Sequence, residues 1–415
     1  MKKKKYFILK YSIIQLFIIL NCCGCITEYV ATDLDQISGI LVVEGVITDN
    51  ESIITLSRSV NFTDRLDGAS FFVNDARVYV ECDDGTLLPA ERPHWGRRDN
   101  GQYTIKTGEL DPNRKYCLKF EIDEVEPGCN MIRSEDTEIN CPIKTYEYRS
   151  DSSYPIQTPE IDSLFWSKRG KGQPVNIHVA THSSDNKLLF CRWSYKEDWE
   201  IKSNILMDYD FCNSCQVAVP ASQDYCPNCG IKWRYPYTCW NAAVSSEIIL
   251  GSTEKTVFGR VSNLLKEIQP TDNRLSVMYR IDVKQNAISK RAYDYYTNIK
   301  KNADQSGSIF APVPSELRGN IFCTTDQGKP VIGYIEVSMT VQKRRYFSSN
   351  DVAYEKPFST CEIIQYPGPP PTNWVYYFIS LPSPFSPPLR YIVQRFCVDC
   401  TMNGGSLNKP VDWDE

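Results

Sequence analysis

Apolar and polar residues alternate at every second position through much of the first third of the chain. This pattern marks five segments: residues 40–47, 53–60, 76–82, 101–105 and 116–122. Turn signals such as Asp83-Asp84-Gly85 and Asp111-Pro112-Asn113 separate them. Strands at this spacing predict an antiparallel β-sandwich over residues 40–145.

A second β-rich unit is predicted after a linker at residues 146–160, which contains a run of Ser and Asp and two prolines. Its strands are expected at residues 175–179, 188–195, 247–250, 274–284 and 331–341. Apolar residues at helical spacing predict one clear helix over 290–302, with Ser289 as its N-cap. Lys290 and Arg291 oppose the helix dipole, so we expect packing to hold this helix. The unit is predicted as a β-rich α+β domain at 161–400, with a Cys-rich insertion at 205–240 and a C-terminal tail at 401–415.

The N-terminus reads as a lipoprotein signal. Lys2 to Lys5 are followed by an apolar run at residues 6–20 and by Asn21-Cys22-Cys23-Gly24-Cys25. An uncleaved membrane anchor fits less well, because the apolar stretch is shorter than the roughly 20 residues that span a bilayer. Gly24 favours lipidation at Cys25, with Cys23 as the alternative. Residues 1–24 are therefore predicted as a signal peptide and 25–39 as a tether, with a covalent lipid on Cys25 as the membrane anchor.

Charge and cysteine content limit which binding partners and which compartment the protein is expected to have. The chain carries 46 Lys and Arg against 51 Asp and Glu, and five of those lysines lie in the predicted signal peptide. The remaining acidic chain has no basic cluster, so we expect no nucleic-acid binding. Seventeen cysteines, three of them in the first 25 residues, suit disulfide bonds in an oxidising compartment. The predicted location is the cell outer membrane, and the sequence does not tell which leaflet the protein faces.

Motifs spread along the chain resemble one known family. They are Leu41–Gly45, Cys239-Trp240, Ser245–Ile248, Ile281–Gln285, Ala292–Tyr296, Gly307–Phe310, Pro314–Leu317, Gly319–Ile321, Val331–Tyr334, Cys397–Cys400 and Gly404–Ser406. Together they are similar to the domain of unknown function 4249 family, which occurs in Bacteroidota lipoproteins often encoded beside outer-membrane TonB-dependent receptors. The first unit also resembles transthyretin-like or immunoglobulin-like sandwiches. The family resemblance implies an outer-membrane location and a TonB-dependent receptor as a partner. It implies no enzymatic activity.

Four cysteines form the strongest site signal. Cys212-x-x-Cys215 and Cys226-Pro-Asn-Cys229-Gly have the spacing of two zinc knuckles, which predicts a structural zinc ribbon with four thiolate ligands. The expected compartment is oxidising, so two disulfides are the alternative. In either case the role is structural, because four ligands leave no open position on the metal.

Other candidates for chemistry are weaker. His178 and His182 could share a strand face, but no acidic or Cys partner lies at ligand spacing, so we expect an exposed strand face. Cys397-x-x-Cys400 precedes a Gly-rich tail, which favours a structural disulfide over a redox pair. The sequence contains no Gly-x-Ser-x-Gly, phosphate-binding glycine loop or His-Glu-x-x-His.

These observations predict a non-catalytic binding or accessory lipoprotein that acts with a TonB-dependent receptor. We expect no enzymatic activity of its own. Two alternatives stay open: a lipid-anchored hydrolase of glycans or peptides whose catalytic residues meet only in three dimensions, and a purely structural envelope scaffold. Aromatic richness, with 25 Tyr and 8 Trp, fits a recognition surface.

Overall fold

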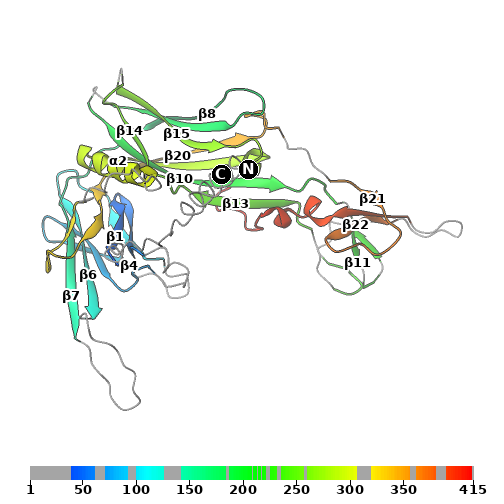
Figure 1. Ribbon diagram of the computed structural model, residues 1–415, viewed down its shortest axis with the longest axis horizontal. Coiled ribbons are helices and arrows are strands. Elements are labelled where there is room, and N and C mark those ends of the chain that lie inside the picture. The colour runs from blue at the N-terminus through cyan, green and yellow to red at the C-terminus, as the bar shows by residue number, and fades with distance from the viewer. Residues whose placement is uncertain are drawn as a thin grey trace, which may run out of the picture.

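The computed structural model consists mainly of β-strands, as predicted (Figure 1). It describes residues 39–60, 71–91, 100–125, 142–183, 187–207, 209–212, 214–215, 217–220, 225–230, 235–256, 259–305, 319–355, 361–379 and 389–413. Cys23, Cys25 and the predicted signal peptide lie outside these residues. Among the described residues, no helix combines the length and the apolar character needed to cross a membrane.

The first unit is a ten-stranded, nearly barrel-shaped sheet. Its strands are β1 (Leu41–Ile47), β2 (Asn50–Arg58), β3 (Arg77–Cys82), β4 (Leu87–Glu91), β5 (Gln102–Gly108), β6 (Tyr116–Val125), β7 (Ile143–Ser150), β17 (Ile321–Cys323), β18 (Val331–Gly333) and β19 (Glu336–Val337). The order is β17-β7-β6-β3-β4-β5-β2-β1-β18, and β19 also pairs with β1. All pairs are antiparallel except those of β1 with β18 and β19. The predicted antiparallel arrangement is therefore present, with three strands added from the second half of the chain.

The two ends of this sheet meet at a pair of glycines. A Cβ atom on Gly319 would lie 1.6 Å from the carbonyl oxygen of Gly333, so only glycine permits this approach. Gly319 lies two residues before the start of β17 and Gly333 ends β18, which places the outermost strands side by side. The curved sheet encloses a core that includes Val80, Tyr103 and Phe120.

One strand of this sheet was missed in the sequence. The predicted hairpin turn at 83–85 is present, and the N–H of Cys82 donates to the carbonyl of Thr86 at 2.9 Å. The strand that follows, β4, contains Pro89 and buries no residue fully. It lacks the apolar alternation by which strands are recognised, and its pairing with β3 and β5 decides its conformation.

The predicted linker at 146–160 needs correction. Residues 146–150 form the second half of β7, where Tyr146, Tyr148 and Ser150 alternate inward. The rest is held by hydrogen bonds: the N–H of Ile156 donates to the carbonyl of Val337 at 2.9 Å. This segment therefore joins the two units by ordered contacts and does not act as a free spacer.

The second unit is a two-layer structure. One layer contains β13 (Thr238–Val244), β10 (Phe190–Lys202), β16 (Met278–Ala287) and β20 (Thr340–Ser348) in that order, with β14 (Ile249–Ser252) also on β10. The other layer is β15 (Arg260–Ile268), β9 (Val175–His182) and β8 (Ile161–Lys168), and a short 3-10 turn, η5 (Asn273–Leu275), precedes β16. Their shared core contains Trp193, Tyr279 and Phe347, all almost fully buried. The indole Nε1 of Trp193 donates to Gln285 Oε1 at 2.7 Å, which satisfies the polar atom that burial would otherwise leave unpaired.

The predicted helix is present as α2 (Lys290–Gln305). Ser289 caps it as expected, because its Oγ accepts from the N–H of Ala292 at 3.1 Å. Glu336 adds a second interaction at this helix end: its Oε2 accepts from the N–H of Ser289 at 3.0 Å and from its Oγ at 2.8 Å. The carboxylate near the N-terminus offsets the basic first turn. Packing also holds the helix, through Ala292 and its tyrosines.

The segment predicted as one strand at 331–341 is three strands. β18 and β19 belong to the first unit. β20 belongs to the second, and two residues separate it from β19. Thr48 and Thr340 join the two sheets here, since Thr48 Oγ1 lies 2.8 Å from Thr340 Oγ1 and accepts from the Thr340 N–H at 3.0 Å. The chain therefore changes sheets within a run whose alternation looks continuous.

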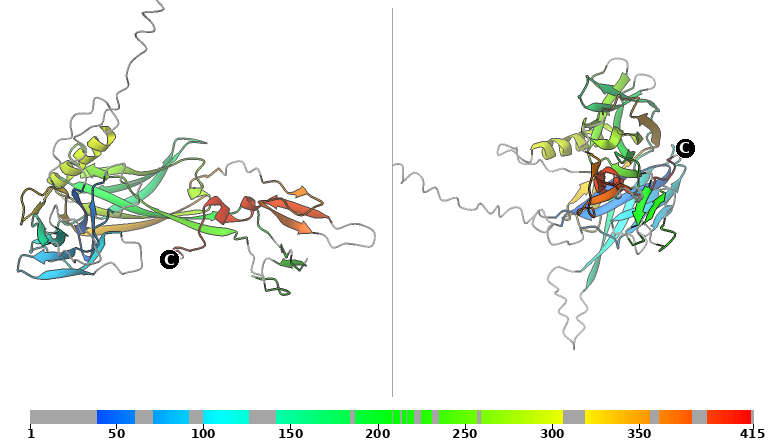
Figure 2. Two further views of the ribbon diagram at one scale, coloured as in Figure 1. Left: turned by 60° about the horizontal axis from the view of Figure 1, so that its bottom comes forward. Right: turned by 90° about the vertical axis from the view of Figure 1, so that its right-hand side faces the viewer.

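A smaller module extends from the far end of the second unit, away from the barrel-like sheet (Figures 1 and 2). It contains β11 (Tyr209–Cys212), β12 (Val217–Pro220), β21 (Ile364–Gln365), β22 (Trp374–Ile379), β23 (Arg390–Gln394), η6 (Arg395–Cys397) and η7 (Cys400–Asn403). We call this the distal module. The proline-rich region after Pro367 contains two paired strands, β22 and β23.

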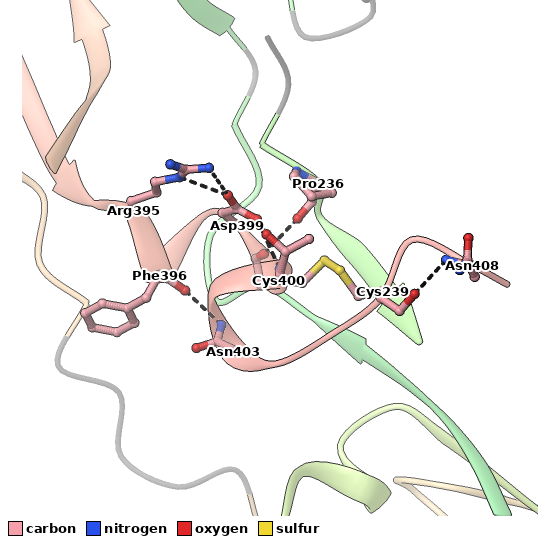
Figure 3. The surroundings of a disulfide bond; sticks show 11 residues. Pro236, Cys239, Arg395, Phe396, Asp399, Cys400, Asn403 and Asn408 are labelled. Carbon is pink, nitrogen blue, oxygen red and sulfur yellow. Dashed lines mark hydrogen bonds and ion pairs between the residues drawn. A yellow bond between two sulfur atoms is a disulfide. The ribbon is translucent and has the colours of Figure 1, made fainter. Parts of the chain in front are cut away.

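Two disulfides hold the distal module. Cys239, in β13, bonds to Cys400 (Figure 3). Cys361 bonds to Cys397. Cys397 and Cys400 are both in structural disulfides, but with distant partners and not with each other. Asp399 fixes the turn between them: it accepts from Arg395 Nε at 3.0 Å and from the N–H of Thr401 at 3.0 Å.

Several cysteines of the described residues are not cross-linked. Cys82, Cys117, Cys191 and Cys323 are buried free thiols in the described part of the chain. Burial raises the pKa of Cys191 to about 12, so this thiol is unreactive at neutral pH. Cys129 and Cys141 lie outside the described residues.

Candidate metal centre

Two short elements of the distal module bring Cys212, Cys215, Cys226 and Cys229 together. Cys212 ends β11 and Cys215 lies in the turn before β12, which is a hairpin knuckle. The second knuckle closes on Gly230, whose φ is 68° and whose N–H donates to the carbonyl of Cys226 at 2.8 Å. Glycine adopts this conformation without strain, which explains the Cys-Pro-x-Cys-Gly pattern.

The geometry fits a tetrahedral metal. The four Sγ atoms all lie within 4.8 Å of one another, and those of Cys212 and Cys229 are 3.4 Å apart. Four thiolates at a Zn–S distance of about 2.3 Å stand roughly 3.8 Å apart. Among the described residues, no other group of His, Cys, Asp or Glu is arranged to hold a metal.

The four thiols influence one another's protonation. The pKa of Cys226 falls to about 7: burial alone would raise it, but the N–H of Asn228 and the thiols of Cys212 and Cys229 donate to its sulfur. The pKa of Cys215 is raised, mainly by its hydrogen bond with Cys229 and by burial. A cation would favour the thiolate at all four positions.

The four cysteines lie around a small apolar core of their own. The cluster's own apolar core contains Cys212, Val219 and Cys226, with Cys215 packed against it. A core this small supplies little hydrophobic stabilisation, so a cross-link or a metal must hold the two knuckles. Four thiolates complete a zinc shell, which leaves no position for substrate or water.

The histidine pair does not form a site. His178 Nε2 lies 2.9 Å from Ser167 Oγ, and its ring stacks on Phe165 at 5.0 Å. His182 Nδ1 lies 2.7 Å from Asp162 Oδ1. Each ring is therefore engaged separately on the outer face of β9, and burial lowers the pKa of His178. This agrees with the expected strand face.

Sequence reasoning missed a buried ion pair in the second unit. Arg280, 1% exposed, donates from Nη2 to Asp198 Oδ2 at 2.7 Å, and Asp198 is also 1% exposed. The C-terminal segment covers this pair: Arg280 Nη1 donates to the carbonyls of Val411 and Asp412 at 3.1 and 2.9 Å, and the Trp413 ring lies 5.4 Å from the guanidinium. The charges stand in ordinary strand patterns far apart in the sequence, so no local signal marks them.

Comparison with known families places the chain. The model of the domain of unknown function 4249 family (DUF4249) matches residues 27–344. The chain belongs to this family. The match includes the four-cysteine cluster and ends before the Cys397–Cys400 motif. No curated protein and no solved structure matches the chain.

Proposed function

We propose that this DUF4249 protein is an outer-membrane lipoprotein that binds or assembles a partner and has no catalysis of its own. One observation carries the proposal: the distal module, which lies at the end of the molecule away from the first sheet (Figure 2), exposes several large apolar side chains. The exposed residues are Leu206, Tyr209, Tyr225, Ile363, Ile364, Leu389 and Met402. Apolar groups gathered on a protruding module are typical of protein interaction sites.

The position of the lipid supports this arrangement. The predicted lipidated Cys25 precedes β1 by a short tether, and β1 lies in the barrel-like sheet. The lipid would therefore hold the first unit near the membrane and leave the distal module to reach a neighbour. The expected lipidation is tested by mass spectrometry of the mature N-terminus: a lipid on Cys25 is the prediction, and a lipid on Cys23 or none contradicts it.

The partner that we propose is a TonB-dependent receptor. This choice rests on the family resemblance and is an analogy. Gentle detergent extraction followed by affinity purification of the full protein should recover an outer-membrane barrel.

Matched variants make this test specific. Leu206→Ser with Tyr209→Ser should abolish recovery, because both residues are more than half exposed on the distal module. Leu188→Ser with Tyr154→Ser changes the same residue types at equal or greater exposure outside it and should leave recovery unchanged. Recovery of the protein alone, with turnover of glycan or peptide substrates, would support the hydrolase alternative instead.

We further propose that the four cysteines bind one structural zinc ion. Protein purified without chelator should contain one zinc per chain by elemental analysis. Cys226→Ala should abolish this content, while Cys82→Ala, at another buried free thiol, should not. Disulfides between the knuckles in non-reducing peptide mapping would refute the zinc assignment.

A further inference from the structure

A cavity of about 190 Å³ lies where the two sheets and the helix meet. Its walls come from β1, β2 and β19 of the first unit, from β10, β16 and β20 of the second, and from α2. The Thr48–Thr340 hydrogen bonds close one side, so the two units are fixed to each other at this point. No sequence motif marks this place, because its residues come from both halves of the chain.

The register of the second sheet puts four hydrogen-bond donors on one wall. Arg192 pairs with Asn286 and Ser194 pairs with Lys284 across β10 and β16. Residues in direct register, and those two apart on one strand, share a face, so these four side chains form a square facing the cavity. The intervening Trp193 points to the opposite face, into the core.

The two cations of this square have no acidic partner among the described residues. The guanidinium of Arg192 lies over the Tyr296 ring at 4.4 Å and donates to its hydroxyl at 3.0 Å, which fixes its direction. Within the described part of the chain, neither Arg192 nor Lys284 forms an ion pair. Arg280 and Arg344, on the same sheet, both pair with aspartates.

Two carboxylates line the cavity from the first unit. Glu336, in β19, is 6% exposed, and its Oε2 accepts both hydrogen bonds from Ser289. No described residue donates a hydrogen bond to its Oε1. Glu51, in β2, is exposed and forms no ion pair with the described residues. The cavity thus holds two positive and two negative groups that do not neutralise one another by direct contact.

We propose that this cavity binds a small zwitterion of the free amino acid class. Its carboxylate would accept from Arg192, Lys284, Ser194 and Asn286, and its ammonium group would donate to Glu336 and Glu51. A simple anion would face two carboxylates and a simple cation would face Arg192 and Lys284, so only a ligand with both charges matches the walls. The volume equals that of roughly six water molecules and is below the range of drug-sized ligands, which fits one amino acid. This inference does not depend on the membrane location or on the receptor partner.

Isothermal titration of the purified full protein with a panel of free amino acids tests the proposal. At least one should bind with a Kd of 1 mM or tighter, whereas propionate and ethylamine, which carry one charge each, should bind at least tenfold more weakly. Lys284→Gln should weaken binding at least tenfold. Lys284 is exposed, so this substitution should not unfold the protein. Lys196→Gln removes an exposed lysine from the same face of β10, outside the cavity lining, and should leave the affinity unchanged.

Three results would overturn the proposal. They are an absence of binding across the panel at 10 mM, equal affinity for propionate, and an affinity that Lys284→Gln changes no more than Lys196→Gln. Glu336→Gln provides a second test. This substitution should weaken binding of the amino acid without improving binding of ethylamine.

Discussion

Removal of the Cys239–Cys400 disulfide should lower the free energy of unfolding by about 5 kcal/mol, which is at least about a third of the stability of an ordinary domain. The two cysteines are 161 residues apart. In the chain-entropy account, a cross-link stabilises by restricting the unfolded chain, and a loop of this length gives about 5 kcal/mol. The Cys361–Cys397 bond closes a 36-residue loop within it and gives about 4 kcal/mol. Removal of the Cys239–Cys400 bond should therefore cost more unfolding free energy than removal of the Cys361–Cys397 bond.

The assay is urea unfolding followed by tryptophan fluorescence. The variant Cys239→Ala/Cys400→Ala is compared with Cys361→Ala/Cys397→Ala, and Cys191→Ala is the control for loss of a buried sulfur without loss of a cross-link. We expect the control to lose about 1 kcal/mol, since it removes one small buried group. Failure of the long-loop variant to fold agrees with the prediction only if the short-loop variant folds.

Two results would refute the reasoning. One is a cost for the long-loop variant no larger than twice that of the Cys191→Ala control. The other is peptide mapping that joins Cys397 to Cys400, because the 161-residue loop would then not exist.

Three further predictions concern charges and the helix cap. Arg280→Met should cost about 3–5 kcal/mol of unfolding free energy, because it removes the buried partner of Asp198 and leaves this carboxylate only the ion pair with the exposed Lys196. Arg280→Met/Asp198→Leu should recover part of this loss in the same urea assay, and equal costs for the two variants would contradict the prediction. Ser289→Ala should cost about 1–2 kcal/mol of unfolding free energy, since the N-cap bond to Ala292 and the donor to Glu336 are both lost; an unchanged urea midpoint would argue against this cap. Burial raises the pKa of Glu336 above its ordinary 4.5, so the folded state binds this proton more tightly than the unfolded state, and stability should fall as pH rises above 4.5. In a plot of the urea midpoint against pH, Glu336→Gln should reduce this fall in stability. A slope identical to that of the unsubstituted protein would exclude Glu336 as the cause of the fall.

The sequence by itself determined the strand positions that alternate cleanly. In β3 and β5 every second residue is buried, so period-two alternation and the turn at Asp83–Gly85 were enough. The cap at Ser289 and the four-cysteine spacing were also readable, because the cap bond and each Cys-x-x-Cys knuckle lie within a few residues of sequence. Local chemistry of this kind does not depend on the rest of the fold.

Only the tertiary structure decided how distant segments meet. The run at 331–341 alternates without a break, yet hydrogen bonding to β1 and then to β16 divides it between two sheets. Cys239 and Cys400 form a disulfide because the fold brings them together, and the spacing of the cysteines in the sequence does not predict this pairing. The cavity is the clearest case: Arg192, Lys284 and Glu336 look like ordinary strand residues, and only the register of β10 with β16 and the pairing of β19 with β1 bring them together. Long-range pairing is a property of the whole chain, because each contact depends on where the others have already placed the backbone.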